Sequence, residues 1–404
     1  MKRLGILTYF QDINPGTFLQ AHAVNQLLAS RLPDWQVELI DCRHSLPAKE
    51  LAGRLSWTQR FAPSRILTSL ERTRLFARCR RKLLSVGRSI DAGSYLSAMS
   101  QLSYCRYDAL VVGSDTVLQI LPEQLQRGEP TAFWLSPALK GTKIIFAGSC
   151  GITQSRQLLP PFCKILSASL NAFDLVGLRD DLSWQLASSL GMHNPRRFER
   201  VSDPTFLLDV DPLPGRQKLS RRLRGDGPIL GIDLSPTMPA YRQIVSHFRR
   251  QGFQIASMRH DPLADASFVD VSPIEWAGMI SHFSLWITSH FHGTVFGLKN
   301  SIQVLAVDYQ PTRYAEDGSS KTRSLLQQFG MERTNHVNFQ EMGLDSGKLI
   351  AAAQRVLSQH DPAALCNKVR LCQAEVEAFL QRACSLLYSA DPRESTPLKE
   401  TVCS

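Results

Sequence analysis

Short apolar runs that end in small or polar residues recur along the first half of the chain. The first run, residues 4–10, is followed by a turn at Asn14-Pro15-Gly16 and a helical stretch over about residues 17–30. Further apolar runs follow at residues 37–40, 109–112, 143–147 and 175–178. In parallel α/β sheets such runs are buried strands, and ligands bind where the strands end. This half is therefore predicted to be an α/β domain.

The second half repeats the pattern after residue 228. Its apolar runs lie at residues 229–233, 253–258, 285–288 and 303–307. A helix is predicted over about residues 240–251. Residues 289–293, with the sequence Ser-His-Phe-His-Gly, are predicted to form a loop before a helix that begins at Thr294. We therefore expect a second α/β domain.

Composition marks the boundaries between these parts. A stretch rich in proline, glycine and arginine separates the halves, so we expect domains at 1–212 and 228–358 with a linker at 213–227. Apolar residues at helical spacing predict a closing helix over 359–390, and residues 391–404 are predicted to be a flexible tail. The predicted fold class is α/β. We expect two Rossmann-like domains that face a cleft, as in the glycosyltransferase-B architecture, with the closing helix packed back across their junction.

The composition is that of a globular protein. The 404 residues are 43% hydrophobic and 20% charged, and no apolar run reaches the ~18 residues of a membrane-spanning helix. The opening apolar run is also too short for the core of a secretory leader. The nine cysteines are scattered and never spaced C-x-x-C, which argues against a disulfide framework or a zinc knuckle and favours the cytoplasm.

The charge of the chain is concentrated in one window. The formal net charge is +10, and residues 54–88, which contain nine arginines, Lys82 and Glu71, account for +9 of it. Apolar residues at three- and four-residue steps predict basic amphipathic helices in this window, after Pro63. We interpret the window as a solvated face, as a surface for anionic lipid or polyanionic glycan, or as a nucleic-acid surface. The last is disfavoured because no nucleic-acid motif accompanies it.

Two residues at predicted strand ends have the chemistry of an anion site. His292 lies between a buried strand and a helix start, where backbone N–H groups favour an anion and an imidazole could pass a proton. It could equally be a histidine that merely caps the helix. Arg179 follows the run at 175–178, so its guanidinium could hold a carboxylate or phosphate, or pair with the adjacent acids. His290 and His292 have no nearby carboxylate or cysteine to complete a zinc site.

Two further segments carry polar groups at predicted turns. Gly113-Ser114-Asp115 follows the run at 109–112 and is either a tight turn whose aspartate caps a helix or a set of ligand contacts. Residues 319–323 place hydroxyls with the cations of Lys321 and Arg323 at a predicted helix start, which suits a phosphate. Neither a P-loop nor a G-x-G-x-x-G after a strand occurs.

Six segments, in this order along roughly residues 3–330, resemble the polysaccharide pyruvyl transferase family. They are Asn14-Pro15-Gly16-Thr17-Phe18-Leu19-Gln20-Ala21, Val111-Val112-Gly113-Ser114-Asp115, Phe146-Ala147-Gly148-Ser149, Leu178-Arg179-Asp180, Asp203-Pro204-Thr205-Phe206-Leu207-Leu208 and Ser289-His290-Phe291-His292-Gly293-Thr294-Val295-Phe296. The family usually has serine or arginine before the phenylalanine of the last motif, where this chain has His290. After the aspartate of the second motif it often has glutamine and then tryptophan, where this chain has Thr116 and Leu118.

The resemblance implies a transferase that moves pyruvate from phosphoenolpyruvate onto a hydroxyl pair of a sugar, in a polysaccharide or a lipid-linked glycan precursor, and releases phosphate. It implies His292 and Arg179 as catalytic residues. Donor contacts are implied at Ser289, Gly293, Thr294, Lys321, Arg323, Gly113, Ser114 and Asp115. The acceptor side is implied at Asn14, Gly16 and Gln20. No metal and no cofactor besides the donor substrate is expected.

The expected partners are phosphoenolpyruvate, a glycan acceptor and an anionic membrane surface contacted through residues 54–88, with no nucleic acid. The chain is then cytoplasmic and peripheral at the inner face of the membrane. Two other functions fit the same architecture. One is a nucleotide-sugar-dependent glycosyltransferase, disfavoured because no acid near residues 289–298 is placed to hold a ribose. The other is a catalytically silent member that binds a glycan or lipid surface, favoured by His290 and the basic window.

Overall fold

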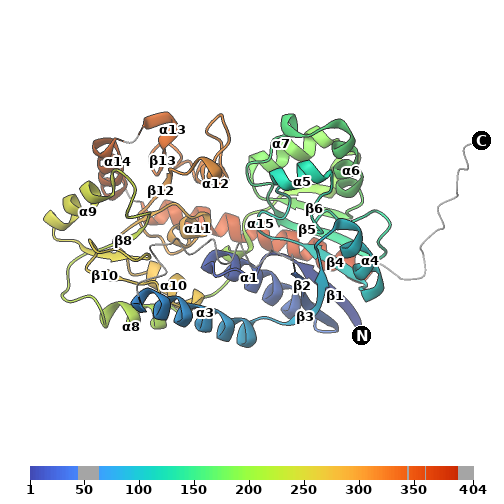
Figure 1. The fold of residues 1–404 in the computed structure, drawn as a ribbon, viewed down its shortest axis with the longest axis horizontal. Coiled ribbons are helices and arrows are strands. Elements are labelled where there is room, and N and C mark those ends of the chain that lie inside the picture. Colours follow the sequence, from blue (N-terminus) through green and yellow to red (C-terminus); the bar gives the residue numbers. More distant parts are fainter. Residues whose placement is uncertain (44–62, 344, 360, 390–404) are drawn as a thin grey trace, which may run out of the picture.

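Two α/β domains, each built on one parallel sheet, lie side by side in the computed structural model, which describes residues 1–43, 63–343, 345–359 and 361–389 (Figure 1). The first domain is on the right of Figure 1 and the second on the left. The predicted fold class is confirmed. The predicted tail, residues 391–404, lies outside the described residues.

The sheet of the first domain has seven strands in the order β3-β2-β1-β4-β5-β6-β7. Along the chain they are β1 (Lys2–Leu7), β2 (Trp35–Arg43), β3 (Val86–Asp91), β4 (Ala109–Val112), β5 (Thr142–Gly148), β6 (Leu175–Leu178) and β7 (Phe198–Arg200). The helices are α1 (Pro15–Arg31), α3 (Pro63–Leu83), α4 (Tyr95–Cys105), α5 (Pro122–Arg127), α6 (Pro160–Asn171) and α7 (Asp181–Leu190). Every residue of β4 and β6 is buried, as the apolar runs predicted for strands covered on both faces.

The sheet of the second domain has six parallel strands in the order β10-β9-β8-β11-β12-β13. They are β8 (Ile229–Asp233), β9 (Gln254–Ser257), β10 (Ala266–Ser267), β11 (Leu285–Thr288), β12 (Val304–Asp308) and β13 (His336–Asn338). The helices are α8 (Leu213–Ser220), α9 (Tyr241–Arg250), α10 (Pro273–Ile280), α11 (Phe291–Lys299), α12 (Lys321–Gln328), α13 (Phe339–Met342), α14 (Ser346–Ser358) and α15 (Pro362–Ser389).

The apolar pattern did not reveal four short strands at or near the sheet edges, β3, β7, β10 and β13. In β3 one residue, Ile90, is buried while Val86 is 45% exposed, so an edge strand of this kind has no continuous apolar run. β10 has two residues, and β7 and β13 have three each. Such lengths are too short for a period-2 pattern to be recognised.

Two segments predicted from composition have more regular structure than expected. Residues 213–227, the predicted linker, contain α8, whose Gly215 packs so closely on α10 that a Cβ there would lie 2.3 Å from the backbone nitrogen of Met279. In the basic window, residues 54–62 lie outside the described residues, 63–83 form α3 as a single helix, and 86–88 belong to strand β3.

The loop predicted at residues 289–293 is shorter than expected because α11 begins at Phe291, with His290 at its N-cap. Gly293 therefore lies inside the helix, and the Trp286 indole nitrogen donates to its carbonyl oxygen at 2.9 Å. A Cβ at Gly293 would lie 2.7 Å from Thr288 Oγ1, so glycine is required for the helix to pack against β11. His292 is consequently a helical residue that faces the first domain.

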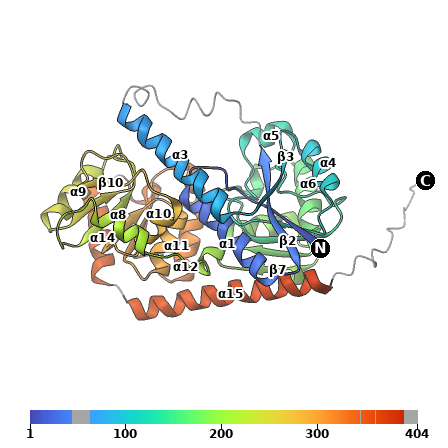
Figure 2. The same ribbon diagram turned by 90° about the horizontal axis from the view of Figure 1, so that it is seen from below.

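Helix α15 runs alongside both domains (Figure 2). Its Phe379 stacks on Phe146 of β5 with ring centroids 5.0 Å apart, and its Lys368 ammonium donates to the Phe329 carbonyl oxygen of the second domain. One apolar cluster extends from α1 and β5 through α10 and α11 to α15, so the two domains share a core. The expected closing helix across the junction is confirmed.

No helix in the described part of the chain is long and apolar enough to cross a membrane. The eight cysteines in that part are all free.

Candidate active site

A cleft of about 590 Å³ lies between the domains where two strand-end crevices face each other. In each sheet the strand order reverses at one position, between β1 and β4 in the first domain and between β8 and β11 in the second. Ligands of α/β sheets bind at such positions. The loop after β1 and Asp115 after β4 line one side of the cleft, and Asp233 and Ser289-His290 line the other.

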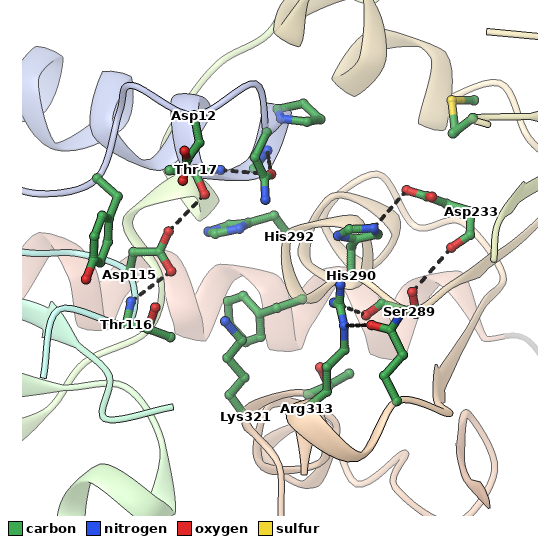
Figure 3. A pocket seen from close by; sticks show the side chains of 18 of the residues that line it. Asp12, Thr17, Asp115, Thr116, Asp233, Ser289, His290, His292, Arg313 and Lys321 are labelled. Carbon is green, nitrogen blue, oxygen red and sulfur yellow. Dashed lines mark hydrogen bonds and ion pairs between the residues drawn. The ribbon is translucent and has the colours of Figure 1, made fainter. Parts of the chain in front are cut away.

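Asp115 is the buried carboxylate of the first-domain side. It accepts hydrogen bonds from Thr17 Oγ1 at 3.1 Å and from the backbone nitrogen of Thr116 at 2.8 Å (Figure 3). Burial alone would raise the pKa of Asp115, but Lys321 and His292 nearby lower it below its ordinary value. Asp115 is therefore ionised at neutral pH. Asn14 caps the adjacent helix α1 by accepting from the backbone nitrogens of Gly16 and Thr17.

Arg179, Asp203 and His292 form a buried network behind this side. Arg179 Nη1 donates to Asp203 Oδ2 at 2.6 Å, and His292 Nε2 lies 3.6 Å from the same oxygen. Burial raises the pKa of Asp203, but the neighbouring His292 and Arg179 outweigh it, and the pKa lies well below its ordinary value. The Arg179 side chain is 1% exposed, and its guanidinium carbon lies 4.4 Å from the centre of the Phe291 ring. Arg179 therefore lies behind Phe291 and does not line the cleft.

A second network surrounds Asp233 at the end of β8. Arg259 Nε donates to Asp233 Oδ1 at 3.0 Å, and Arg259 Nη2 lies 3.1 Å from His290 Nε2. Burial lowers the pKa of His290 to about 4, so its ring is neutral at pH 7. Because a guanidinium only donates, we assign Nε2 of His290 as the acceptor and place its ring proton on Nδ1. Burial raises the pKa of Asp233, but the positive charges around it, of which those of Arg259, Arg72 and Arg313 are present at pH 7, lower it below its ordinary value.

Two more guanidinium groups reach the neighbourhood of Asp233 from other elements. Arg313, in the short turn η5 (Pro311–Arg313), donates to the Ser289 carbonyl oxygen at 2.6 Å and to Gln310 Oε1 at 2.7 Å. Arg72 comes from the basic helix α3 and donates to the Ile13 carbonyl oxygen at 3.3 Å. With Arg259, three cations therefore act on one carboxylate on this side of the cleft.

Lys321 is the first residue of α12 and lines the cleft opposite Asp115. Its ammonium lies 5.4 Å from the centre of the Phe291 ring, and it has no hydrogen bond or ion pair with any residue that the structure describes. Burial lowers the pKa of Lys321 to about 8. Figure 3 shows Lys321 and Arg313 approaching His292 and His290 from the same side. An unpaired ammonium in a partly desolvated cleft is suited to an anionic ligand.

The position of Lys321 is held by a buried carboxylate. Ser320, the N-cap of α12, donates from Oγ to Asp308 Oδ2 at 2.5 Å, and His336 Nε2 lies 2.8 Å from the same oxygen. Ser320 Oγ also accepts from the backbone nitrogen of Arg323 at 3.0 Å. These contacts connect the start of α12 to strands β12 and β13.

The structure brings together part of the predicted site. The cleft is lined by six of the predicted residues: His292, Ser289, Lys321, Asp115, Asn14 and Gly16. Seven others do not line it: Arg179, Gly293, Thr294, Arg323, Gly113, Ser114 and Gln20.

Several of these seven support the backbone of the cleft. Gln20 Nε2 donates to Thr8 Oγ1 at 2.9 Å, and its Oε1 accepts from Ser114 Oγ at 2.6 Å, so this pair holds β1 and β4 together at their ends. Gly113 has a φ of +121°, and a Cβ there would lie 2.2 Å from the Phe146 carbonyl oxygen. Arg323 pairs with Glu341 at 2.5 Å outside the cleft.

Sequence reasoning missed the cluster of Asp233, Arg259, Arg313 and Arg72. Asp233 ends the apolar run at 229–233 and Arg259 follows the run at 253–258, so both had the same strand-end signal as Arg179. Arg72 had no such signal, because it is one of nine arginines in the basic window and only the packing of α3 points it into the cleft. Across the described residues, no three His, Cys, Asp or Glu side chains gather as a metal ion would require.

Residues 14–311 match the family model of the polysaccharide pyruvyl transferases. No curated protein sequence matches the chain. Among solved structures, the chain is similar to the UDP-GlcNAc 2-epimerase of Methanocaldococcus jannaschii in complex with UDP-GlcNAc and UDP, with a TM-score of 0.52 and 9% identity over 93% of this chain and 100% of that one. The UDP-GlcNAc 2-epimerase of Neisseria meningitidis has a TM-score of 0.52 and 8% identity over 94% and 100% of the two chains. Anabaena HepE in complex with UDP and glucose has a TM-score of 0.53 and 10% identity over 96% and 100%. At these identities the similarity concerns the fold alone.

Proposed function

Because the chain belongs to the polysaccharide pyruvyl transferase family, we propose that its cleft transfers the pyruvyl group of phosphoenolpyruvate to two hydroxyls of one sugar and releases phosphate. The sugar belongs to a polysaccharide or to a lipid-linked precursor of one. The observation that carries the proposal is the unpaired ammonium of Lys321, which lies in the cleft with His292 and Arg313. These three groups meet the needs of a small, highly charged anion.

In this proposal the donor binds on the second-domain side of the cleft. Phosphoenolpyruvate carries a phosphate and a carboxylate close together, so two cations must reach it from different directions. Lys321 and Arg313 supply them, and His292 has a buried Nε2 without a hydrogen-bond partner among the described residues. An N–H group of His292 that reaches phosphoenolpyruvate would form a charge-assisted hydrogen bond to it. Such a bond is roughly twice as strong as one between neutral groups.

The acceptor sugar then occupies the first-domain side. This side offers the Asp115 carboxylate, the Thr116 hydroxyl and the amide of Gln119, which are groups that bind sugar hydroxyls. Asp115 is ionised and can accept a hydrogen bond from the attacking hydroxyl, which orients the oxygen toward the donor. Of the three residues expected on the acceptor side, Asn14 and Gly16 line this wall of the cleft and Gln20 does not, so the proposed acceptor contacts include the first two alone.

The reaction then proceeds in balanced steps. A proton adds to the methylene carbon of the donor, a sugar hydroxyl oxygen bonds to the neighbouring carbon, and the hydroxyl proton is released. The second hydroxyl bonds to the same carbon, its proton is released, and the carbon–oxygen bond to phosphate breaks, which leaves a ketal. His292 is the residue proposed to supply the proton, since its imidazole lines the cleft and its Nε2, which faces Asp203, has no hydrogen bond to a described residue.

Arg179 has a different role in this proposal from the one expected from sequence. Its guanidinium is buried behind Phe291 and paired with Asp203, so it does not reach a ligand in this arrangement of the domains. Asp203 in turn faces His292 Nε2. Arg179 is therefore a positioning residue that keeps Asp203 ionised and oriented toward His292.

The decisive experiment incubates the purified protein with phosphoenolpyruvate and a panel of glycan and lipid-linked acceptors, and measures phosphate release together with pyruvyl ketal in the product by mass spectrometry. Thermal shifts with phosphoenolpyruvate, UDP-sugars and GDP-sugars run in parallel. Stabilisation by phosphoenolpyruvate with phosphate release would support the proposal. Stabilisation by a nucleotide-sugar alone would replace it with the glycosyltransferase alternative.

The basic helix α3 supports a peripheral membrane location on the cytoplasmic side. Its outward face carries Arg74, Arg78 and Arg81, all exposed, with Leu67 67% and Leu70 49% exposed beside them. Cations with apolar side chains on one helix face suit an anionic membrane surface. A lipid-linked acceptor would then be bound at the membrane surface that holds its lipid.

A further inference from the structure

One group in the cleft has no use in the reaction proposed above. Arg72 is contributed by α3. With described residues it makes one hydrogen bond, to the Ile13 carbonyl oxygen, and its guanidinium carbon lies 5.7 Å from the centre of the Phe76 ring. Its Nε is buried without a partner among the described residues. A buried guanidinium nitrogen that is left unpaired costs free energy unless a ligand satisfies it.

The charges of Arg72 and Arg259 both act on Asp233, and all three side chains line the cleft. Arg259 is bonded to Asp233, and the charges of Arg72 and Arg313 also act on that carboxylate. His290 is neutral, so three guanidinium groups face one carboxylate, and two positive charges remain uncompensated. Lys321 and Arg313 already serve the donor. Of the remaining Arg72 and Arg259, Asp233 compensates one charge, so one positive charge, together with the unpaired Nε of Arg72, is available to a second anion.

The wall beside these two arginines is apolar. Met258, Phe268, Val271 and Trp276 all line the cleft here, and each is less than a tenth exposed. Phosphoenolpyruvate has no apolar group to place against such a wall. The cleft, at about 590 Å³, is in the range of about 300–1,000 Å³ typical of pockets for much larger ligands, so the donor leaves most of it unfilled.

We propose that Arg72, Arg259 and this apolar wall form a second anion subsite, which binds the phosphate of an acceptor whose sugar is joined through phosphate to an apolar chain. The inference rests on the proposed function, because it names the class of acceptor for that same cleft. The arginines bind the phosphate, and the wall binds the first part of the chain. The sugar then extends toward Asp115 and the donor.

The geometry favours the acceptor over the donor as the source of this phosphate. Arg72 enters beside Ile13, which belongs to the loop after β1 on the side assigned to the acceptor. The same helix presents Leu67, Leu70 and its outer arginines to the exterior, so α3 extends from this subsite to the surface that we assign to the membrane.

The test uses octyl phosphate as the probe, with inorganic phosphate, octyl glucoside and UDP as comparisons, and calorimetry on the full chain. We expect octyl phosphate to bind more tightly than inorganic phosphate or octyl glucoside, and to bind in the presence of saturating phosphoenolpyruvate. Arg72→Gln should weaken it by about tenfold or more, as for the loss of a charge-assisted bond. Arg74→Gln, which removes an exposed arginine of the same helix, should leave it unchanged.

Each arm has an outcome that overturns the inference. Octyl phosphate that binds no better than inorganic phosphate would exclude the apolar wall, and full competition by phosphoenolpyruvate would mean one shared anion site. Tighter, Arg72-dependent binding of UDP would assign the subsite to a nucleotide. Equal effects of Arg72→Gln and Arg74→Gln, with both variants folded by circular dichroism, would show that only the overall charge of α3 matters. A failure of phosphoenolpyruvate to bind would refute the proposed function. The octyl phosphate measurement would still decide whether Arg72 and the apolar wall bind an alkyl phosphate.

Discussion

Lys321 links the chemistry of the cleft to pH. The ordinary pKa of a lysine is 10.5, and burial lowers that of Lys321 to about 8 in the unliganded protein. The residue is mostly protonated at pH 7 and loses its charge as the pH rises through about 8. Lys321 forms no ion pair with any described residue, although the charge of Asp115 acts on it, so a bound anion would raise its pKa again.

Donor binding should therefore weaken at alkaline pH. Affinity for phosphoenolpyruvate is expected to be nearly constant between about pH 6.5 and 7 and to fall progressively above about pH 8, since binding then requires uptake of a proton. Lys321→Met should lower affinity about 10- to 100-fold at pH 7 and flatten the profile. Calorimetry across this pH range measures both. Arg323→Gln, on the same helix but outside the cleft, is the matched control, and an equally steep profile in Lys321→Met would rule out Lys321 as the titrating group.

The two histidines of the last motif should differ in their effects. His292→Ala is expected to remove most phosphate release, because it deletes the proposed proton donor, whereas His290→Ser should leave donor binding within a few-fold of the unmodified protein. His290 is neutral, with its pKa at about 4, so its loss removes a hydrogen-bond acceptor of Arg259 but no charge at pH 7. Phosphate release and donor affinity, measured for both variants, test this. Loss of donor binding in His290→Ser would place the donor against Asp233 instead.

For single residues, the sequence predicted cleft positions best where a residue follows a strand or begins a helix. Asp115, His292 and Lys321 have such positions, and all three line the cleft. Arg179 has the same local signal and is buried instead. The difference depends on the Phe291 ring and the Asp203 carboxylate, which both contact the guanidinium of Arg179. No local sequence pattern predicts contacts between residues so far apart in the chain.

Among the elements, α3 shows how one helix can have two different faces. Phe76 is 1% exposed and packs on Phe18 of α1, and Arg72 lies toward the cleft. The opposite face carries exposed arginines and leucines. The sequence indicated a basic amphipathic helix after Pro63, but residue spacing alone could not indicate which arginine would point inward, since that depends on where α1 and α10 lie.

The outward face of α3 should bind anionic vesicles. We expect binding to vesicles that contain anionic lipid at low salt and much weaker binding at physiological ionic strength, where exposed charges are screened within about 8 Å. The combined change Arg74→Gln, Arg78→Gln and Arg81→Gln should abolish most of it, while Arg72→Gln should not. Co-sedimentation with anionic and neutral vesicles provides the measurement. If both kinds of vesicle sediment the protein equally at low salt, α3 is only a solvated face.

For the molecule as a whole, the shared apolar cluster and α15 make the two domains one cooperative unit. α15 contacts Phe146 in the first domain and Phe329 in the second, and the cluster around it includes residues of both. The two sheets were predictable because each repeats a strand-helix pattern. The shared cluster was not, because apolar periodicity identifies a buried face but not the surface that buries it.

Thermal unfolding is accordingly expected to be a single transition. Phe379→Ala should destabilise the whole protein by about 3–5 kcal/mol, since this ring is 1% exposed and its removal leaves a cavity beside Phe146. Leu371→Ala on the same helix, at a side chain that is 65% exposed, should change stability by less than about 0.5 kcal/mol. Differential scanning calorimetry distinguishes these outcomes. Two separate transitions, with one shifted in Phe379→Ala, would contradict the shared core.

The position of α15 in the chain also affects how the protein is made. Both sheets are complete once residue 338 has been synthesised, and the first domain emerges from the ribosome well before the second. The helix that contacts both domains consists of residues 362–389 and follows them all. Each sheet can form during translation, but the apolar surfaces that α15 covers stay open until residues 362–389 have also been made. The nascent chain is therefore expected to depend most on chaperones in the interval between completion of the second sheet and the emergence of α15.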